Sequence, residues 1–125
     1  HKNYKELHRN LIESIKNFNL LYYGCIQKKW EEVIIEKNNY KANNSYGAFA
    51  YAVDKRMFKI LLEKYEELVN PTDKCLIEIS NMNYSVVSYP NIFITDLENG
   101  KIHRKRDFTS HSKHFKWNSN NYFIN

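Results

Sequence analysis

The sequence predicts an α/β fold in which helices flank a mixed sheet, and three observations support this prediction. Segments with helical periodicity alternate with short apolar segments from the N-terminus to about residue 100. Hydrophobic residues make up 42% and aromatic residues 15% of the 125 positions, which is a globular composition. Glycine and proline residues separate the expected elements. We therefore expect one α/β unit over residues 1–100, and a basic, irregular tail over residues 101–125 that packs on it.

A helix followed by a strand is expected at the N-terminus. Apolar side chains recur at spacings of three and four over residues 4–18, with charged and polar residues between them. Residues 20–23 predict a short buried strand that Gly24 closes. The apolar stripe of the helix consists of Tyr4, Leu7, Leu11, Ile15 and Phe18.

Residues 25–44 leave two interpretations open. Trp30, Val33 and Ile34 fit one face of a helix, but residues 33–35 fit a strand equally well. The polar, asparagine-rich segment 38–44 predicts a surface loop.

The segment from residue 45 to residue 73 is the best-defined unit. Small and large side chains alternate over residues 49–53, as in a buried strand that helices pack against tightly. Asp54 is a good N-cap for the helix that follows, and Pro71 is expected to end that helix. The buried stripe of this helix is expected to contain Met57, Phe58, Leu61, Leu62 and Tyr65.

A short helix and two extended pieces are expected next. The helix begins at residue 72 or 73, and Leu76 and Ile79 face the core. Residues 84–89 predict a strand that the following proline ends, and residues 91–95 predict a second extended piece.

The chain is basic, with a net charge of +5 and a dense basic block at residues 101–106. This charge permits a polyanionic partner: nucleic acid, anionic lipid or a phosphorylated small molecule. One helical turn is expected near residues 109–116 of the tail. The tail is expected to pack through its aromatic residues, Phe108, Phe115, Trp117, Tyr122 and Phe123.

The two cysteines, Cys25 and Cys75, match no metal-binding spacing and lie among apolar residues. We expect free, buried thiols in a reducing compartment, and therefore a cytoplasmic protein. The longest apolar runs fall far short of the ~20 residues that span a bilayer, so no transmembrane segment is predicted.

Two candidate sites follow from the residues alone, and each has a structural alternative. Asp73 follows a proline turn, where a carboxylate can accept the proton of a hydroxyl group or bind a sugar hydroxyl. It can also simply cap the helix over residues 74–82. The basic block can clamp a diphosphate or a nucleic-acid backbone, or it can be a solvated loop.

A metal-binding role is considered for the histidines of the tail. His111 and His114 have a spacing that can place both on one helical face, but no cysteine or carboxylate beside them completes a zinc pattern. His103 is the metal or phosphate ligand that we predict, completed by residues elsewhere. The sequence contains no glycine-rich phosphate loop and no Asp-x-Asp motif.

Four blocks of the sequence carry a resemblance through their order and spacing over residues 4–118. They are Asn19–Gly24 after the first helix, Tyr46–Val53 leading into Met57–Leu62, Asn70–Asp73, and Tyr89–Ile94 with Asn99–His103. Together they resemble the C-terminal half of a GT-A glycosyltransferase of the family 25 type. That group includes lipopolysaccharide and procollagen glycosyltransferases and enzymes of large DNA viruses.

The resemblance implies that a sugar moves from a nucleotide-sugar donor to a hydroxyl group of a glycan or protein acceptor. A divalent metal, Mn²⁺ or Mg²⁺, would neutralise the leaving diphosphate, held mostly by carboxylates upstream of this chain. Asp73 would bind the acceptor or act as the general base. The substrate contacts that the resemblance implies are those of Tyr46, Gly47, Tyr51, His103 and Arg104.

Two departures from the family pattern qualify these expectations. The metal-binding Asp-x-Asp of the family should precede the Asn19–Gly24 block, so the resemblance implies a fragment that is inactive alone and needs the upstream half of the same enzyme. Residues 100–102 also lack the hydroxyl and carboxylate that the family has there. The rival hypothesis is a non-enzymatic, basic nucleic-acid-binding module that uses residues 101–117.

Overall fold

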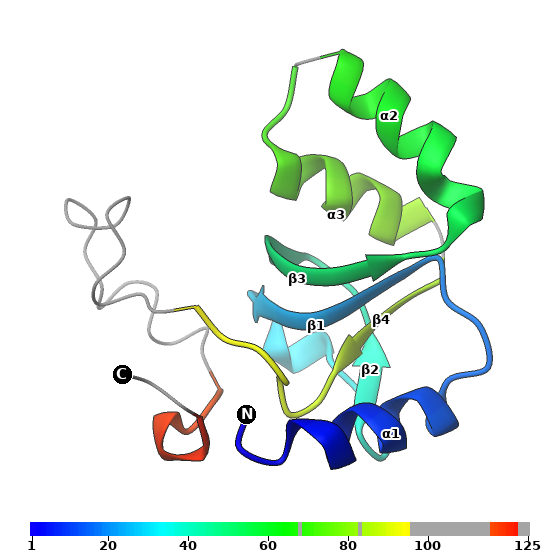
Figure 1. Ribbon diagram of the computed structural model, residues 1–125. Helices are drawn as coiled ribbons and strands as arrows, with labels where there is room; N and C mark the ends of the chain where they lie inside the picture. The colour runs from blue at the N-terminus through cyan, green and yellow to red at the C-terminus, as the bar shows by residue number, and fades with distance from the viewer. Residues whose placement is uncertain (68, 83, 96–115, 123–125) are drawn as a thin grey trace, which may run out of the picture.

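A four-stranded mixed sheet forms the middle of the protein in the computed structural model, which describes residues 1–67, 69–82, 84–95 and 116–122 (Figure 1). The strand order is β2–β4–β1–β3. The two central strands, β1 and β4, are parallel, and each edge strand is antiparallel to its neighbour. The strands are β1 (Leu20–Gln27), β2 (Asn39–Lys41), β3 (Ser45–Val53) and β4 (Ser85–Ser88).

Helices cover both faces of this sheet (Figure 1). Helix α1 (Tyr4–Ser14) lies on one face, and α2 (Phe58–Glu66) and α3 (Thr72–Met82) lie on the other. The predicted α/β class, with a mixed sheet and flanking helices, is therefore confirmed. Among the described residues, no helix has the length and apolar character needed to cross a membrane.

The alternation of side chains along β1 divides the core into two clusters. Leu20 and Tyr22 pack with α2 and α3, whereas Leu21 packs with α1, and all three side chains are fully buried. The cluster under α2 and α3 is the larger one. Its buried members are Leu20, Tyr22, Cys25, Tyr40, Ala42, Met57, Leu61, Leu76, Ile79 and Val87.

Two predicted boundaries at the N-terminus were wrong. Helix α1 ends at Ser14 rather than near residue 18, because Ile15 adopts an extended backbone. Strand β1 does not end at Gly24 but continues to Gln27. Gly24 is a position of close approach inside the strand rather than a terminator, as its contacts below show.

Neither interpretation of residues 25–44 is correct. A single 3-10 turn occupies Trp30–Glu32, and residues 33–35 form neither helix nor strand. The predicted surface loop contains β2, in which Asn39 and Tyr40 are buried because the strand pairs with β4.

Residues 45–66 form the predicted strand and helix, but several of their side chains are more exposed than predicted. Strand β3 is half-exposed over most of its length because it is an edge strand. Asp54 is a cap, although of the 3-10 turn Lys55–Met57 that leads into α2 rather than of α2 itself: its Oδ1 accepts a hydrogen bond of 2.9 Å from the backbone N–H of Arg56. In the helical stripe, Phe58 and Leu62 are 54% and 60% exposed, so their predicted burial was wrong.

The prediction for the following elements was mostly confirmed. Helix α3 begins at Thr72, Leu76 and Ile79 are buried, and β4 lies within the predicted strand. The Tyr89–Pro90 peptide bond is cis. The second extended piece, at 91–95, forms no strand. The turn predicted at 109–116 lies outside the described residues, apart from Lys116, which is not helical.

Candidate functional site

The carboxyl ends of the parallel strands β1 and β4 meet at one end of the sheet, and helices α1 and α3 begin there (Figure 1). In open α/β sheets, ligands bind in the crevice outside the carboxyl ends of parallel strands. The positive ends of the two helix dipoles point to the same region. We call this region the carboxyl end.

The chain after β4 packs tightly onto β1 at the carboxyl end. The backbone carbonyl of Tyr23 accepts hydrogen bonds from the N–H groups of Ile92 and Phe93, at 2.7 and 3.2 Å. The side-chain amide of Asn91 donates to the carbonyl of Cys25 at 3.0 Å. A Cβ atom at Gly24 would collide with the backbone carbonyl of Phe93, so only glycine permits this contact.

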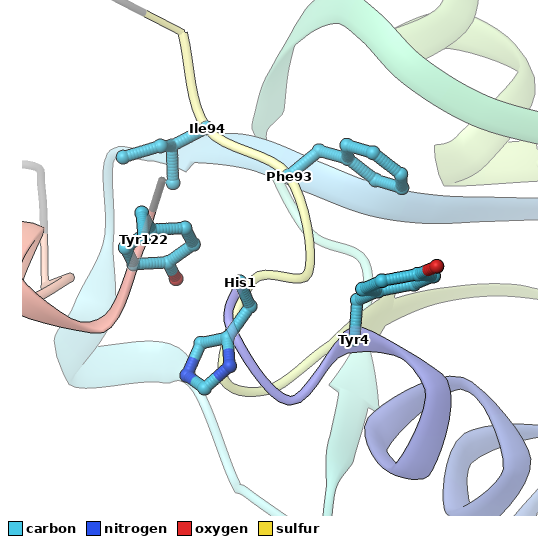
Figure 2. Close-up of a pocket in the computed structure, with 5 residues that line it drawn as sticks. All are labelled: His1, Tyr4, Phe93, Ile94 and Tyr122. Carbon is cyan, nitrogen blue, oxygen red and sulfur yellow. The ribbon is translucent and has the colours of Figure 1, made fainter. Parts of the chain in front are cut away.

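Two adjoining hollows open beside this contact, and they share Tyr4 and Phe93 as walls. Figure 2 shows the smaller hollow, of about 270 Å³, whose walls come from three separate segments of the chain. The larger hollow measures about 380 Å³. We call the pair the aromatic hollow, which is lined by His1, Tyr4, Lys5, His8, Tyr23, Ile92, Phe93, Ile94 and Tyr122.

Aromatic rings dominate the walls of the aromatic hollow. The rings of Tyr23 and Phe93 meet edge to face with centroids 6.3 Å apart, and the His8 ring lies 5.6 Å from Tyr23. Tyr122 is held in place because its hydroxyl donates to the carbonyl of Asn91 at 2.6 Å. Burial raises the pKa of the Tyr23 hydroxyl. The hollow therefore offers ring faces for stacking, with a phenol, an imidazole and a lysine ammonium at its margins.

A second polar cluster lies inside the protein near the end of β1, and it is structural. The Ser45 hydroxyl donates to Gln27 Oε1 at 2.7 Å, and Gln27 Nε2 donates to the carbonyl of Asn43 at 2.6 Å. The Cys25 thiol lies 3.5 Å from the Tyr40 hydroxyl. Burial raises the pKa of Cys25 to about 12, so this thiol is not a nucleophile at neutral pH.

Both cysteines are free and buried, as predicted from the sequence. The thiol of Cys75 contacts the backbone carbonyls of Lys64 and Asn70 between α2 and α3. These contacts give Cys75 a packing role.

Asp73 lies in the first turn of α3, which begins at the carboxyl end (Figure 1). Its side chain is partly exposed, and Oδ1 accepts a hydrogen bond of 3.0 Å from the N–H of Lys74. Since α3 begins at Thr72, Asp73 is inside the helix rather than at its cap. Burial raises the pKa of Tyr22 far above its usual range. The charge of Asp73 is one of several smaller effects in the same direction.

The structure separates the other substrate-binding residues predicted on β3. Tyr46 pairs with Ile26 near the carboxyl end of β1, and the Lys28 ammonium lies 3.7 Å from the centre of its ring. Gly47 has a φ of 101°, which favours glycine. Tyr51 pairs with Tyr22 near the start of β1, roughly 15 Å along the strand from Tyr46. One sugar ring therefore cannot contact both Tyr46 and Tyr51.

The predicted diphosphate and metal ligands, His103 and Arg104, lie outside the described residues, as does the basic block. Among the residues that are described, no group of three or more histidine, cysteine, aspartate or glutamate side chains is arranged to hold a metal ion. The described residues thus provide no metal site of their own, and we derive no step through a metal.

The sequence did not indicate the aromatic hollow. Tyr4 was assigned to the buried stripe of the first helix, but it is 45% exposed. The available signal was the presence of aromatic residues both at a helix N-terminus, Tyr4, and three positions after Pro90, Phe93. Recognising it required knowledge that these segments meet.

Comparisons with models of protein families, with curated proteins and with solved structures found no match to this chain. The resemblance to family 25 glycosyltransferases therefore depends on the quoted residues alone.

Proposed function

We propose that this chain forms the acceptor-side part of a GT-A-like glycosyltransferase, which transfers a sugar from a nucleotide-sugar donor to a hydroxyl acceptor. The observation that carries the proposal is the contact between two of the four resembling blocks. Tyr23 and Gly24 belong to the first block, and Ile92 and Phe93 belong to the last. Almost 70 residues apart in sequence, they form one hydrogen-bonded unit at the carboxyl end of the sheet.

The same two blocks supply walls of the aromatic hollow, and this supports a carbohydrate ligand. Pyranose rings have one apolar face of C–H groups and a rim of hydroxyl groups. Tyr4 and Phe93 offer exposed ring faces, while Lys5, His8 and the Tyr23 hydroxyl lie where rim hydroxyls need partners. In this proposal the hollow holds a sugar ring of the acceptor.

Asp73 is the proposed general base or acceptor ligand. Its carboxylate is partly exposed in the first turn of a helix that begins at the same carboxyl end as the hollow. The side chain does not line the hollow, so the acceptor would extend from the hollow toward α3. The divalent metal and most donor contacts would belong to the upstream half of the enzyme, and His103 and Arg104 of this chain would approach the diphosphate.

Ligand binding by the hollow is testable on the 125-residue chain. We expect methyl glucoside, galactoside or mannoside to shift backbone amide NMR signals of residues 4–8, 23 and 92–94. Phe93→Ala should weaken this binding about tenfold, because it removes one ring face. Tyr84→Ala is the matched control, since Tyr84 is 53% exposed against 51% for Phe93 and lies at the opposite end of β4. Equal effects of both variants, or no shift with any glycoside, would contradict the assignment.

Transfer itself is to be measured with the natural full-length protein, nucleotide-sugars and Mn²⁺. We expect Asp73→Asn to lower the turnover rate about 100-fold or more, as loss of a general base does. Glu66→Gln, an exposed carboxylate change at the end of α2, should leave turnover unchanged. Full activity of the Asp73→Asn enzyme would remove this residue from the proposed mechanism.

The nucleic-acid hypothesis predicts a different result. Tight oligonucleotide binding that weakens steeply with salt, and that is lost when Arg104 and Arg106 are neutralised, would favour the rival hypothesis. No contact of the described residues favours it over the glycosyltransferase.

A further inference from the structure

The charged side chains around the aromatic hollow have one sign. Among the described residues that line the hollow, Lys5 is a cation, and His1 and His8 are the two that can become cations. None of these lining residues is an aspartate or a glutamate. A ligand in the hollow therefore meets a rim that attracts negative charge.

The two acidic residues of α1 are turned away from the hollow. Each residue of a helix is rotated by about 100° from the one before it, so Tyr4, Lys5 and His8 fall within about 100° of one another round the axis. By the same geometry, Glu6 lies about 160° and Glu13 about 140° from His8. Neither carboxylate lines the hollow. The side of α1 that borders the hollow is therefore positive.

No neighbouring carboxylate neutralises Lys5 in the described part of the chain. Four ion pairs are formed there, all by cations outside α1, and Lys5 belongs to none of them. Lys64 is the contrasting case, because its ammonium lies 2.8 Å from the carboxylate of Glu78. The Lys5 side chain is exposed, so its ammonium can meet a negatively charged group of a ligand.

The larger hollow brings two further hydrogen-bonding groups to the margin where Lys5 lies. The His8 ring is tilted by 44° against the Tyr23 ring, with the ring centres 5.6 Å apart. A phenol and an imidazole can each donate a hydrogen bond to an anionic oxygen. The apolar ring faces of Tyr4 and Phe93 form the rest of the wall. The hollow thus combines apolar surfaces with one cation and two donors.

We propose that the sugar held in the aromatic hollow is anionic, and that Lys5 and His8 bind its carboxylate or phosphate group. This inference rests on the proposed function, because it names the class of acceptor sugar at the same site. A hexuronic acid has a carboxylate at C6 and keeps the apolar C–H face of a neutral hexose. That face lies against Tyr4 and Phe93, while the charged group at the rim of the ring reaches the positive side of α1.

NMR titrations with matched ligands test the proposal. Methyl glucoside, galactoside and mannoside are each compared with the corresponding methyl uronide, which differs only in having a carboxylate in place of the hydroxymethyl group. We expect the uronide to bind about fivefold more tightly at low salt, as one partly exposed charge pair allows. Lys5→Gln should bring the two affinities together. Lys16→Gln is the matched control, since it removes the same charge from an exposed lysine beyond the other end of α1 and should keep the preference.

Glucose 6-phosphate and inorganic phosphate distinguish the two sources of the charge. Tighter binding of glucose 6-phosphate than of the uronides would support the inference with phosphate as the anionic group. If inorganic phosphate alone bound as tightly as either charged sugar, the sugar ring would contribute nothing, and the inference would be overturned.

The remaining outcomes separate this inference from the proposed function. Equal affinities for a neutral glycoside and its uronide would overturn the anionic class and leave a sugar in the hollow. No binding of any of these sugars would overturn both proposals. Melting curves establish that the lysine variants fold, and the exposed His8→Gln replaces Lys5→Gln if that variant does not. A uronide preference that survives in the variant used would show that α1 does not bind the charged group.

Discussion

The parallel pair β1–β4 and the edge strand β3 belong to one sheet, yet they are specified in different ways. The parallel pair is covered by helices on both faces, and its residues are almost all buried. Among the described residues, strand β3 has a neighbour on one side only, and most of its residues are half-exposed. In the parallel pair, the backbone of β1 contacts another backbone segment with no free space between them. In β3, the close contacts are with side chains that can still move.

The two strand glycines express this difference. At Gly24 of β1, a Cβ atom would meet the backbone carbonyl of Phe93, which the adjacent hydrogen bonds hold in place. At Gly47 of β3, a Cβ atom would meet only the ring of Phe49, although the φ of 101° disfavours other residues. A carbonyl in a hydrogen-bonded segment cannot withdraw, but a half-exposed phenyl ring can rotate.

Gly24→Ala is therefore the substitution with the largest expected effect. We expect it to lower the free energy of unfolding by about 3 kcal/mol, at the upper end of the cost of overpacking. Gly47→Ala should cost about 1–2 kcal/mol, mainly as backbone strain. Urea unfolding followed by circular dichroism measures both values. An equal or reversed order would show that the contact between β1 and the segment after Pro90 is adaptable.

Two buried serines sharpen the comparison with a smaller effect. The Ser45 hydroxyl of β3 donates to Gln27, so Ser45→Ala leaves a buried amide oxygen without this donor and should cost about 2 kcal/mol. The Ser85 hydroxyl of β4 is buried with no hydrogen-bond partner among the described residues. Ser85→Ala should therefore be neutral or raise the free energy of unfolding by up to about 1 kcal/mol.

The same urea experiment measures these serine variants, and each is the control for the other because both remove one hydroxyl from a fully buried serine. A loss of stability in Ser85→Ala similar to that in Ser45→Ala would mean that the Ser85 hydroxyl has a partner in solution.

Local sequence signals determined the α/β class, the sites of most elements and the cap at Asp54. These features follow from interactions between residues close in sequence: helical periodicity, capping and the backbone limits of proline. Leu76 and Ile79 were correctly placed inside because their helix has a single apolar stripe. For the same reason, Cys25 and Cys75 among apolar neighbours were correctly expected to be buried.

Only the tertiary structure decided which strands are central, what Gly24 is for and where the aromatic hollow lies. Phe58 and Leu62 fit the pattern of a buried stripe, but burial depends on whether another element covers that side of the helix. Gly24 looked like a strand end because its obstacle, the carbonyl of Phe93, is almost 70 residues away in sequence. Contacts between distant segments are set by packing, and a local pattern carries no record of the partner.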